Sequence, residues 1–283
     1  MQNAKKASIT QIDPRLFDAL QVVLQQYLPV IPSGIPLAKL TTVLDAGCGL
    51  HQWGKALFRV MIEQAGPDLV SDVRIEGIEL QPDITQTANA QIRTGRGQVF
   101  VSQGDVFHFP ANRTEWYDLV QARFLAPYVA PHDWPGLLAE LVRVCKSGGW
   151  VVWIEPAFPT TGERTPGWNN LLASIERVVT QLGGSPQIVG SMETLFHQSG
   201  YWKEFKTSNV SIPFSTVSPA SGSLLIEQYR TLRSQFLALR PAMIAGGISA
   251  DTFERIFQEV LNEFNTRTVA SQWMWKTIYG QKQ

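Results

Sequence analysis

The sequence has no excess of charge of either sign and no long hydrophobic run, and each absence narrows what the protein can do. Lysine plus arginine number 24, and so do aspartate plus glutamate, so no long-range basic field attracts nucleic acid or an anionic membrane. No stretch reaches about 18 consecutive apolar residues, the length of a membrane-spanning helix. The first residues lack an apolar core behind their lysines. We therefore expect a cytoplasmic protein without nucleic-acid or membrane partners.

Cysteine is also scarce, which limits the covalent and metal chemistry that the chain can support. Cys48 and Cys145 are the only two cysteines, too few for a disulfide framework, and neither has partners at metal-ligand spacing. A reducing compartment fits them. No cluster has the carboxylate arrangement that magnesium prefers, and the sequence predicts no metal site.

Hydrophobic periodicity indicates an α/β protein. Of the 283 residues, 44% are hydrophobic, enough for one elaborated domain. An amphipathic helix is predicted over Asp13–Leu28. From Thr41 onward, short apolar runs alternate with helical stretches, the pattern of a parallel, doubly wound sheet covered on both faces. The predicted strands are TTVLDA, VRIEGIEL, QVFVSQGD, YDLVQAR, GWVVWIEP and FKTSNVSIPF, and the helices are Trp53–Ala65, Asp83–Ile92, Trp134–Val144, Asn169–Leu182 and Met192–Gln198.

The last part of the chain combines a helical insertion with a final strand. Helices are predicted over Leu224–Leu239 and Ala250–Thr266, before a strand in SQWMWKTIYGQK. The insertion is in a position to cover the strand ends as a lid, although simple packing or a dimer interface also explains its apolar residues. Monomer and homodimer therefore both stay open. The expected organisation is a single domain, 1–283, with an amino-terminal helical cap (1–40), a cofactor-binding core (41–156), remaining core helices and a strand (157–223), a helical lid (224–266) and a last strand (267–283).

The run VLDAGCGLHQWG, Val43–Gly54, carries the main functional signal. Gly47 and Gly49 allow backbone conformations closed to other residues and let a ligand approach bare amides. The helix that follows directs its free N–H groups at the same place, which suits an anionic or carboxylate-bearing ligand. Asp45 is placed to accept hydrogen bonds from loop amides or from a ligand ammonium. A tight structural turn is the alternative.

Two further acids follow the next two strands. Glu79 ends the second strand, where a ribose diol needs an acceptor, and Leu80 offers an apolar neighbour for a base. Asp105 follows the third strand and could accept a hydrogen bond from an exocyclic amine. Each acid alone could be a solvated loop residue. Two acids at successive strand ends instead favour a nucleoside cofactor, because ligands of open parallel sheets bind at those ends.

The spacing disfavours a nicotinamide dinucleotide and resembles another family. A dinucleotide site wants a third glycine where Gln52 stands, and an acid closer to the loop than Glu79. The Asp-x-Gly-x-Gly form, together with WYDLVQARFLAPYVAPHDWPGLLAELVRVCKSGGWVVWIEP, resembles the class I S-adenosylmethionine-dependent methyltransferases. The similarity is greatest to the branch of fungal and bacterial secondary-metabolism enzymes that modify small molecules, with Ser147 in place of a proline.

The resemblance implies a fold and a set of contacts. The fold is a mostly parallel seven-stranded sheet whose last strand is antiparallel. The implied cofactor is S-adenosylmethionine, with S-adenosylhomocysteine as product. Asp45, Gly47, Cys48, Gly49 and His51 would lie at the methionine portion, Glu79 at the ribose, Leu80, Asp105 and Val106 at the adenine, and Gln121, Ala122 and Arg123 near the methionine ammonium and the substrate.

His51 is the departure from the family pattern, which commonly has glycine at this position. One interpretation is that the loop no longer needs a positive φ here and that the imidazole contacts the cofactor carboxylate; the other is acid–base catalysis. Methyl transfer is a direct displacement that alignment can accelerate without a base. The weak catalytic candidates are His51, Arg123, His132, Glu155 and His197. Arg123 could hold a substrate anion or form a salt bridge with a strand-end acid.

These observations together predict an enzyme that methylates a small, largely apolar metabolite, with an oxygen acceptor preferred over nitrogen or carbon. The principal alternative keeps the S-adenosylmethionine pocket without transferring methyl, for regulation, structural support or a reaction such as a cyclisation. A nicotinamide-dependent oxidoreductase is a more distant third. The sequence does not name the substrate.

Overall fold

A seven-stranded sheet forms the centre of the molecule. The computed structural model describes residues 27–66, 70–93, 97–157, 165–181, 183–215, 240–241, 243–244, 247–266 and 270–283. The strand order is β3-β2-β1-β4-β5-β7-β6, which confirms the predicted fold class. The strands are β1 (Thr42–Ala46), β2 (Arg74–Glu79), β3 (Val99–Gln103), β4 (Tyr117–Arg123), β5 (Cys145–Pro156), β6 (Trp202–Ser215) and β7 (Ala270–Lys282).

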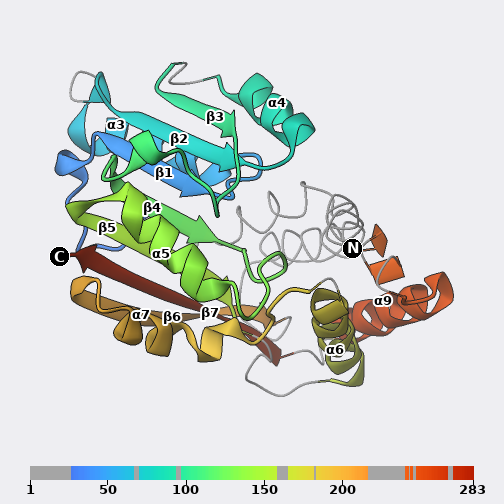
Figure 1. Cartoon of the computed structure of the whole chain (residues 1–283). Coiled ribbons are helices and arrows are strands. Elements are labelled where there is room, and N and C mark those ends of the chain that lie inside the picture. Colours follow the sequence, from blue (N-terminus) through green and yellow to red (C-terminus); the bar gives the residue numbers. More distant parts are fainter. Residues whose placement is uncertain are drawn as a thin grey trace.

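The sheet is parallel except at one strand. Strands β1 to β5 pair in parallel, while β7 runs antiparallel to both of its neighbours, β5 and β6 (Figure 1). The antiparallel last strand implied by the family resemblance is therefore confirmed. The parallel arrangement brings the carboxyl ends of β1, β2, β4 and β5 to one edge, where Ala46 pairs with Ile78 and with Ala122.

Six α-helices of the described residues surround the sheet. They are α3 (Gln52–Ala65), α4 (Pro82–Gln91), α5 (Trp134–Val144), α6 (Pro166–Gln181), α7 (Met192–Ser199) and α9 (Ala250–Asn265). Apolar residues of α3, α4, α6 and α9 share one core with residues 28–40. Those of α5 and α7 share a second core with the opposite face of the sheet. Two apolar layers therefore sandwich the sheet, as its uninterrupted apolar strands require.

The segment before β1 is tied to the first helix after it. The indole of Trp53 on α3 donates a hydrogen bond to the carbonyl of Val30 at 2.6 Å, and Leu28, Ile31 and Ile35 are buried in the core on that side. The predicted helices Asp13–Leu28, except for its last two residues, and Leu224–Leu239 lie outside the described residues.

Helix α9 is packed against α6 where the sequence predicts part of a lid. Phe253 and Val260 are fully buried, and α6 and α9 lie side by side in Figure 1. Glu263 of α9 accepts hydrogen bonds from the backbone amides of Gly167 at 2.7 Å and Trp168 at 3.2 Å, at the start of α6. These contacts favour the packing explanation for α9, and a lid function stays a prediction.

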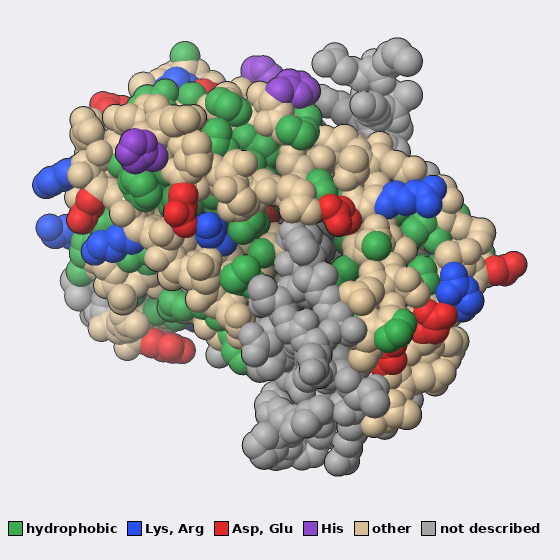
Figure 2. Space-filling view, turned by 90° about the horizontal axis from the view of Figure 1, so that it is seen from below, with side chains coloured by type: hydrophobic (Ala, Val, Ile, Leu, Met, Phe, Trp, Pro, Cys, Tyr) green, Lys and Arg blue, Asp and Glu red, His purple; other side chains and the backbone are tan. Residues whose placement is uncertain are grey.

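The surface carries mixed charge. On the face drawn in Figure 2, acidic and basic side chains are interspersed among hydrophobic and polar ones, in keeping with the equal numbers of the two signs. None of the helices in the described part of the chain is long and apolar enough to cross a membrane.

Candidate active site

The glycine loop after β1 is held against two neighbouring segments. The amides of Gly47 and Cys48 both donate to the carbonyl of Ile78 on β2, each at 3.0 Å. Gly47 has φ +69°, and a Cβ added to it would lie 2.6 Å from the Leu125 side chain. Gly49 has φ +52°, and an added Cβ would meet nothing within 4 Å. The loop is thus closed by packing at Gly47 and open at Gly49, where the backbone is accessible to a ligand.

Glu79 joins the end of β2 to this loop. Its Oε2 accepts a hydrogen bond from the Gly49 amide at 3.1 Å, and its Oε1 accepts one from the Gln81 amide at 3.0 Å. The carboxyl is partly buried, and burial raises its pKa. Each oxygen keeps further acceptor capacity. The next residue, Leu80, is 49% exposed, as an apolar surface for a base requires.

Asp45 and His51 form a buried pair beneath the loop. His51 Nδ1 lies 2.9 Å from Asp45 Oδ2, and the two residues are 0% and 2% exposed. Asp45 is therefore engaged by the chain itself. The first interpretation of His51, a loop that has lost its positive φ, is wrong, because His51 has φ +57°.

Two glycines explain how an imidazole fits at this position. A Cβ added to Gly77 on β2 would lie 2.8 Å from His51 Nδ1, and one added to Gly54 on α3 would overlap the ring. The ring therefore fills a slot between α3 and β2. His51 Nε2 has no hydrogen-bond partner among the described residues. Because the side chain is fully buried, neither nitrogen is available to a ligand in this conformation.

The end of β4 presents two polar side chains on the same face as Asp45. Gln121 pairs in register with Asp45, and strand alternation places Arg123 on that face too. The guanidinium of Arg123 lies 5.7 Å from the Trp53 ring centroid, and burial lowers its pKa to about 10, against the opposing effect of Asp45. Ala122 is buried in the core of the opposite face, so only its backbone could contact a ligand at this site.

The acid after β3 is more exposed than those after β1 and β2. Asp105 accepts hydrogen bonds from the Phe107 amide at 3.0 Å and faces His108 Nδ1 at 3.2 Å. Its side chain is 33% exposed and that of His108 is 81% exposed. Val106 is partly buried against the second core. Asp105 is thus accessible for an additional hydrogen bond.

Glu155 is an internal anchor, which corrects its place among the catalytic candidates. It is 0% exposed and accepts hydrogen bonds from the amides of Leu125 at 2.8 Å and Ala126 at 3.2 Å, and from the Trp153 indole at 3.1 Å. Burial raises its pKa to about 7, although these donors oppose the effect. The carboxylate fixes the turn after β4, whose Leu125 side chain packs on Gly47.

The remaining histidine candidates are not assembled into this site. His132 is 83% exposed and lies 3.4 Å from Asp133. His197 is exposed on α7, the helix whose apolar side packs into the core on the other face of the sheet. The structure therefore gives neither residue a partner for acid–base chemistry at the strand ends.

Three residues near the site escaped sequence reasoning. Burial, followed by the negative charge of Glu79, raises the pKa of Tyr128 well above its usual range; the tyrosine follows the β4 turn. Trp53 supports Arg123, and Leu125 packs on Gly47. No residue pattern marked them, because each contact joins segments distant in sequence. Cys48, a predicted loop contact, is partly buried, and burial raises its thiol pKa.

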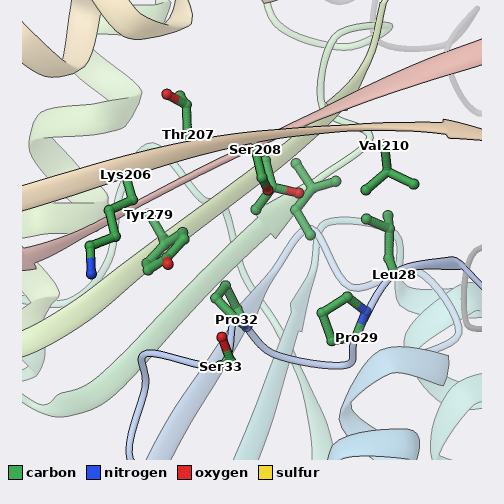
Figure 3. Close-up of a pocket in the computed structure, with 11 residues that line it drawn as sticks. Leu28, Pro29, Pro32, Ser33, Lys206, Thr207, Ser208, Val210 and Tyr279 are labelled. Carbon is green, nitrogen blue, oxygen red and sulfur yellow. The ribbon is translucent and has the colours of Figure 1, made fainter.

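A separate cavity lies over β5, β7 and β6, on the face of the sheet that also carries Gln121 and Arg123. It has a volume of about 420 Å³. Figure 3 shows Pro29, Pro32 and Ser33 on one side and Lys206 and Tyr279 toward one end. Ile154 on its floor pairs in register with Arg123. The lining residues are Leu28, Pro29, Pro32, Ser33, Ile154, Lys206, Thr207, Ser208, Val210, Thr277 and Tyr279.

No group of three histidine, cysteine, aspartate or glutamate residues in the described ranges is arranged to hold a metal ion. The donor set at the strand ends suits a nucleoside instead. Open space beside Gly49, acceptors at Glu79 and Asp105, and an exposed Leu80 fit a ribose and a base. The side-chain amide of Gln121 is fully buried and has no hydrogen-bond partner among the described residues.

The sheet order, the antiparallel β7 and the glycine loop define the class I methyltransferase fold. Residues 43–149 match the family model described as a methyltransferase domain, and the chain carries such a domain. No curated protein matches the sequence. The secondary-metabolism branch stays a prediction.

Solved structures are similar in fold at low sequence identity. A phosphoethanolamine N-methyltransferase 2 of Haemonchus contortus, solved with phosphomonomethylethanolamine and S-adenosylhomocysteine, has a TM-score of 0.56 at 13% identity, over 95% of this chain and 57% of that one. The same nematode enzyme with S-adenosyl-L-methionine has 0.51 at 14%, over 93% and 52%. This chain thus spans little more than half of those chains. The YcgJ protein of Bacillus subtilis has 0.52 at 13%, over 94% and 99%.

Proposed function

We propose that this protein binds S-adenosylmethionine at the carboxyl ends of β1, β2 and β4 and transfers its methyl group to a small molecule. The observation that carries the proposal is the hydrogen bond between Glu79 and the Gly49 amide at 3.1 Å. It unites the glycine loop with an accessible acid at the next strand end, the arrangement that holds a nucleoside in open parallel sheets. The matched methyltransferase domain, residues 43–149, contains both residues.

Named residues would hold each part of the cofactor. Glu79 would accept the ribose hydroxyls, Leu80 would contact the base, and Asp105 would accept from its amine. The glycine loop and the end of β4 would face the amino-acid portion. The sulfonium of the bound cofactor supplies an electrophilic methyl group. The protein then contributes alignment and exclusion of water, and these need no base. This suits a site where Glu155 and His51 are buried in other roles.

The finer proposal concerns the acceptor, for which a small, largely apolar metabolite with an oxygen nucleophile stays our expectation. The cavity of about 420 Å³ supports the first half, because pockets for small molecules are mostly apolar with a few polar groups. Leu28, Pro29 and Val210 supply apolar walls beside serine and threonine hydroxyls. Ile154, which lines the cavity, pairs in register with Arg123 at the end of β4, so the cavity lies beside the proposed cofactor site.

Replacement of Glu79 tests the cofactor site. Glu79→Ala removes a charge-assisted acceptor worth about 1.5–3 kcal/mol, so S-adenosylhomocysteine should bind at least about tenfold more weakly in a calorimetric titration. Glu204→Ala, which removes an exposed acid on β6, is the matched control and should leave the affinity unchanged. Equal affinity of wild type and Glu79→Ala would refute the assignment.

A second ligand separates direct ribose contact from loop support. If Glu79 holds the ribose, wild type should bind the 2′-deoxy analogue of S-adenosylhomocysteine more weakly than the parent, and Glu79→Ala should discriminate less between the two. Detection of a methylated product by mass, with S-adenosylhomocysteine formed in proportion, distinguishes methyl transfer from a protein that only retains the pocket.

A further inference from the structure

The cavity over β5, β7 and β6 has two chemically different ends. Lys206 pairs in register with Tyr279, and Val210, further along β6, pairs with Trp275. Figure 3 shows Lys206 and Tyr279 toward one end of the cavity and Leu28 and Val210 toward the other. At about 3.3 Å per residue, positions 206 and 210 lie about 13 Å apart along the strand. A ligand that fills the cavity therefore meets polar groups at one end and apolar walls at the other.

Lys206 gives the first end an uncompensated positive charge. It is the only charged residue among the described residues that line the cavity, and it has no ion pair within the described part of the chain. Lys276 and Lys282 on the neighbouring strand β7, by contrast, each pair with a glutamate, at 2.8 Å and 3.3 Å. The three N–H donors of the Lys206 ammonium thus keep their capacity for a ligand.

Hydroxyl groups lie around this cation. Tyr279, Ser33 and Ser208 line the cavity, and none of these side chains has a hydrogen-bond partner among the described residues. The Tyr279 ring is held in place by the apolar core and by Trp150, with the two ring centroids 6.1 Å apart. Because Lys206 and Tyr279 are cross-strand neighbours, the ammonium and the hydroxyl can donate to the two oxygens of one anionic group.

The other end of the cavity is apolar and firmly supported. Leu28 and Ile154 are 9% and 4% exposed and belong to the core on this face of the sheet, against which Val210 packs. The carbonyl of Val30, close to Leu28 in the chain, accepts a hydrogen bond from the Trp53 indole at 2.6 Å, which anchors this wall to α3. Apolar ligand surface placed here is removed from water, and this favours binding.

We propose that the cavity binds an amphipathic carboxylate, with its anionic group at Lys206 and Tyr279 and an apolar body of about 13 Å along Leu28 and Val210. A neutral polar group would leave the ammonium uncompensated, and a wholly apolar ligand would displace its water without replacing the hydrogen bonds. One ammonium balances the single charge of a carboxylate, whereas a phosphate monoester carries nearly two charges. The proposal deepens the proposed function and rests on it only for the ligand's role as methyl acceptor.

Calorimetric titration of three small molecules into the wild-type protein tests the two ends. Octanoate has both features, octanamide lacks the charge, and butanoate has a shorter chain. Octanoate should bind about fivefold or more tighter than octanamide, through charge-assisted hydrogen bonds, and this preference should shrink in high salt. It should bind about tenfold or more tighter than butanoate, because each buried methylene adds affinity. No binding of octanoate, or binding equal to that of either comparison compound, would overturn the proposal.

Replacement of Lys206 locates the bound carboxylate. Lys206→Met keeps an unbranched stem without the charge and should lose the preference for octanoate over octanamide, whereas Lys206→Arg should retain it. Tyr279→Phe keeps the ring beside Trp150 and should weaken octanoate several-fold. The octanamide affinity should stay the same in all three variants, which reports an intact cavity.

Lys203→Met is the matched control, because it removes an exposed cation on β6 that does not line the cavity. It should bind octanoate as the wild type does. An unchanged preference in Lys206→Met, or the same loss of preference in Lys203→Met, would refute the site.

The same titrations, repeated with S-adenosylhomocysteine present, separate this proposal from the proposed function. If the wild type fails to bind S-adenosylhomocysteine but binds octanoate through Lys206, the proposed function fails and the amphipathic site stands. If S-adenosylhomocysteine binds but octanoate shows no dependence on Lys206 in either series, the amphipathic site fails and the proposed function stands.

Discussion

The carboxyl edge of the sheet has two regions that use the same chemical group differently. At the ends of β2 and β3, Glu79 and Asp105 are partly accessible and retain acceptor capacity. At the ends of β1 and β5, Asp45 and Glu155 are 2% and 0% exposed and are bound by donors of the chain itself. An acid at a strand end is therefore a candidate ligand contact only where the neighbouring loop leaves it open.

The largest expected effect comes from removing Glu155, the buried acid at the end of β5 whose oxygens are bound by donors of the chain. Glu155→Ala leaves two backbone amides and an indole N–H buried without an acceptor, at a cost of about 3–5 kcal/mol in the free energy of unfolding. Glu79→Ala should cost about 1 kcal/mol, because its two amides can turn to water. Urea denaturation of both variants measures the difference, and equal losses would erase the distinction between the two regions.

Buried Glu155 should also make the stability of the protein depend on pH. Burial raises the pKa of Glu155 from 4.5 to about 7 in the folded protein, so the folded state binds more protons than the unfolded state between those values. Its contribution to stability is fully present below pH 4.5 and is lost as pH rises to about 7, by on the order of 3 kcal/mol. Glu155→Gln cannot ionise, and its unfolding free energy, followed by urea titration across this range, should lack that decline. Parallel curves for the two proteins would contradict the prediction.

A smaller loss of stability is expected from breaking the buried pair of His51 and Asp45 at the end of β1. His51→Gly relieves a positive φ but empties the slot between Gly54 and Gly77 and leaves Asp45 without its partner. We expect a net loss of about 1–2 kcal/mol, measured by thermal unfolding. His51→Asn should lose less, because asparagine tolerates this conformation and can still donate to Asp45. A large fall in single-turnover rate, with S-adenosylhomocysteine affinity and stability both unchanged, would instead indicate catalysis.

The smallest effect on stability is expected at Asp105, the partly exposed acid after β3. His108 is 81% exposed beside Asp105, and surface pairs of this kind contribute little. His108→Ala should change the free energy of unfolding by less than about 0.5 kcal/mol and leave Asp105 free to accept from a ligand. A loss of stability comparable to that of His51→Gly would group Asp105 with the buried acids Asp45 and Glu155.

Much of the fold could be predicted because its signals are local. Apolar runs gave the described strands, and helical periodicity gave α3, α4, α5, α6, α7 and α9 to within a few residues. The antiparallel direction of β7 came from the family resemblance, since the residue pattern of a strand does not reveal which neighbour it pairs with. The positions of Glu79 and Asp105 at strand ends followed from the same patterns.

The sequence by itself determined where polar groups stand along each strand, because side-chain alternation and glycine turns depend on neighbouring residues. Only the tertiary structure decided which of these groups remain open. Glu155 is closed by a turn that begins after β4, and His51 is enclosed by glycines of α3 and β2. Such contacts join segments far apart in the chain, and close packing between them, which no local pattern encodes, sets the environment of each acid.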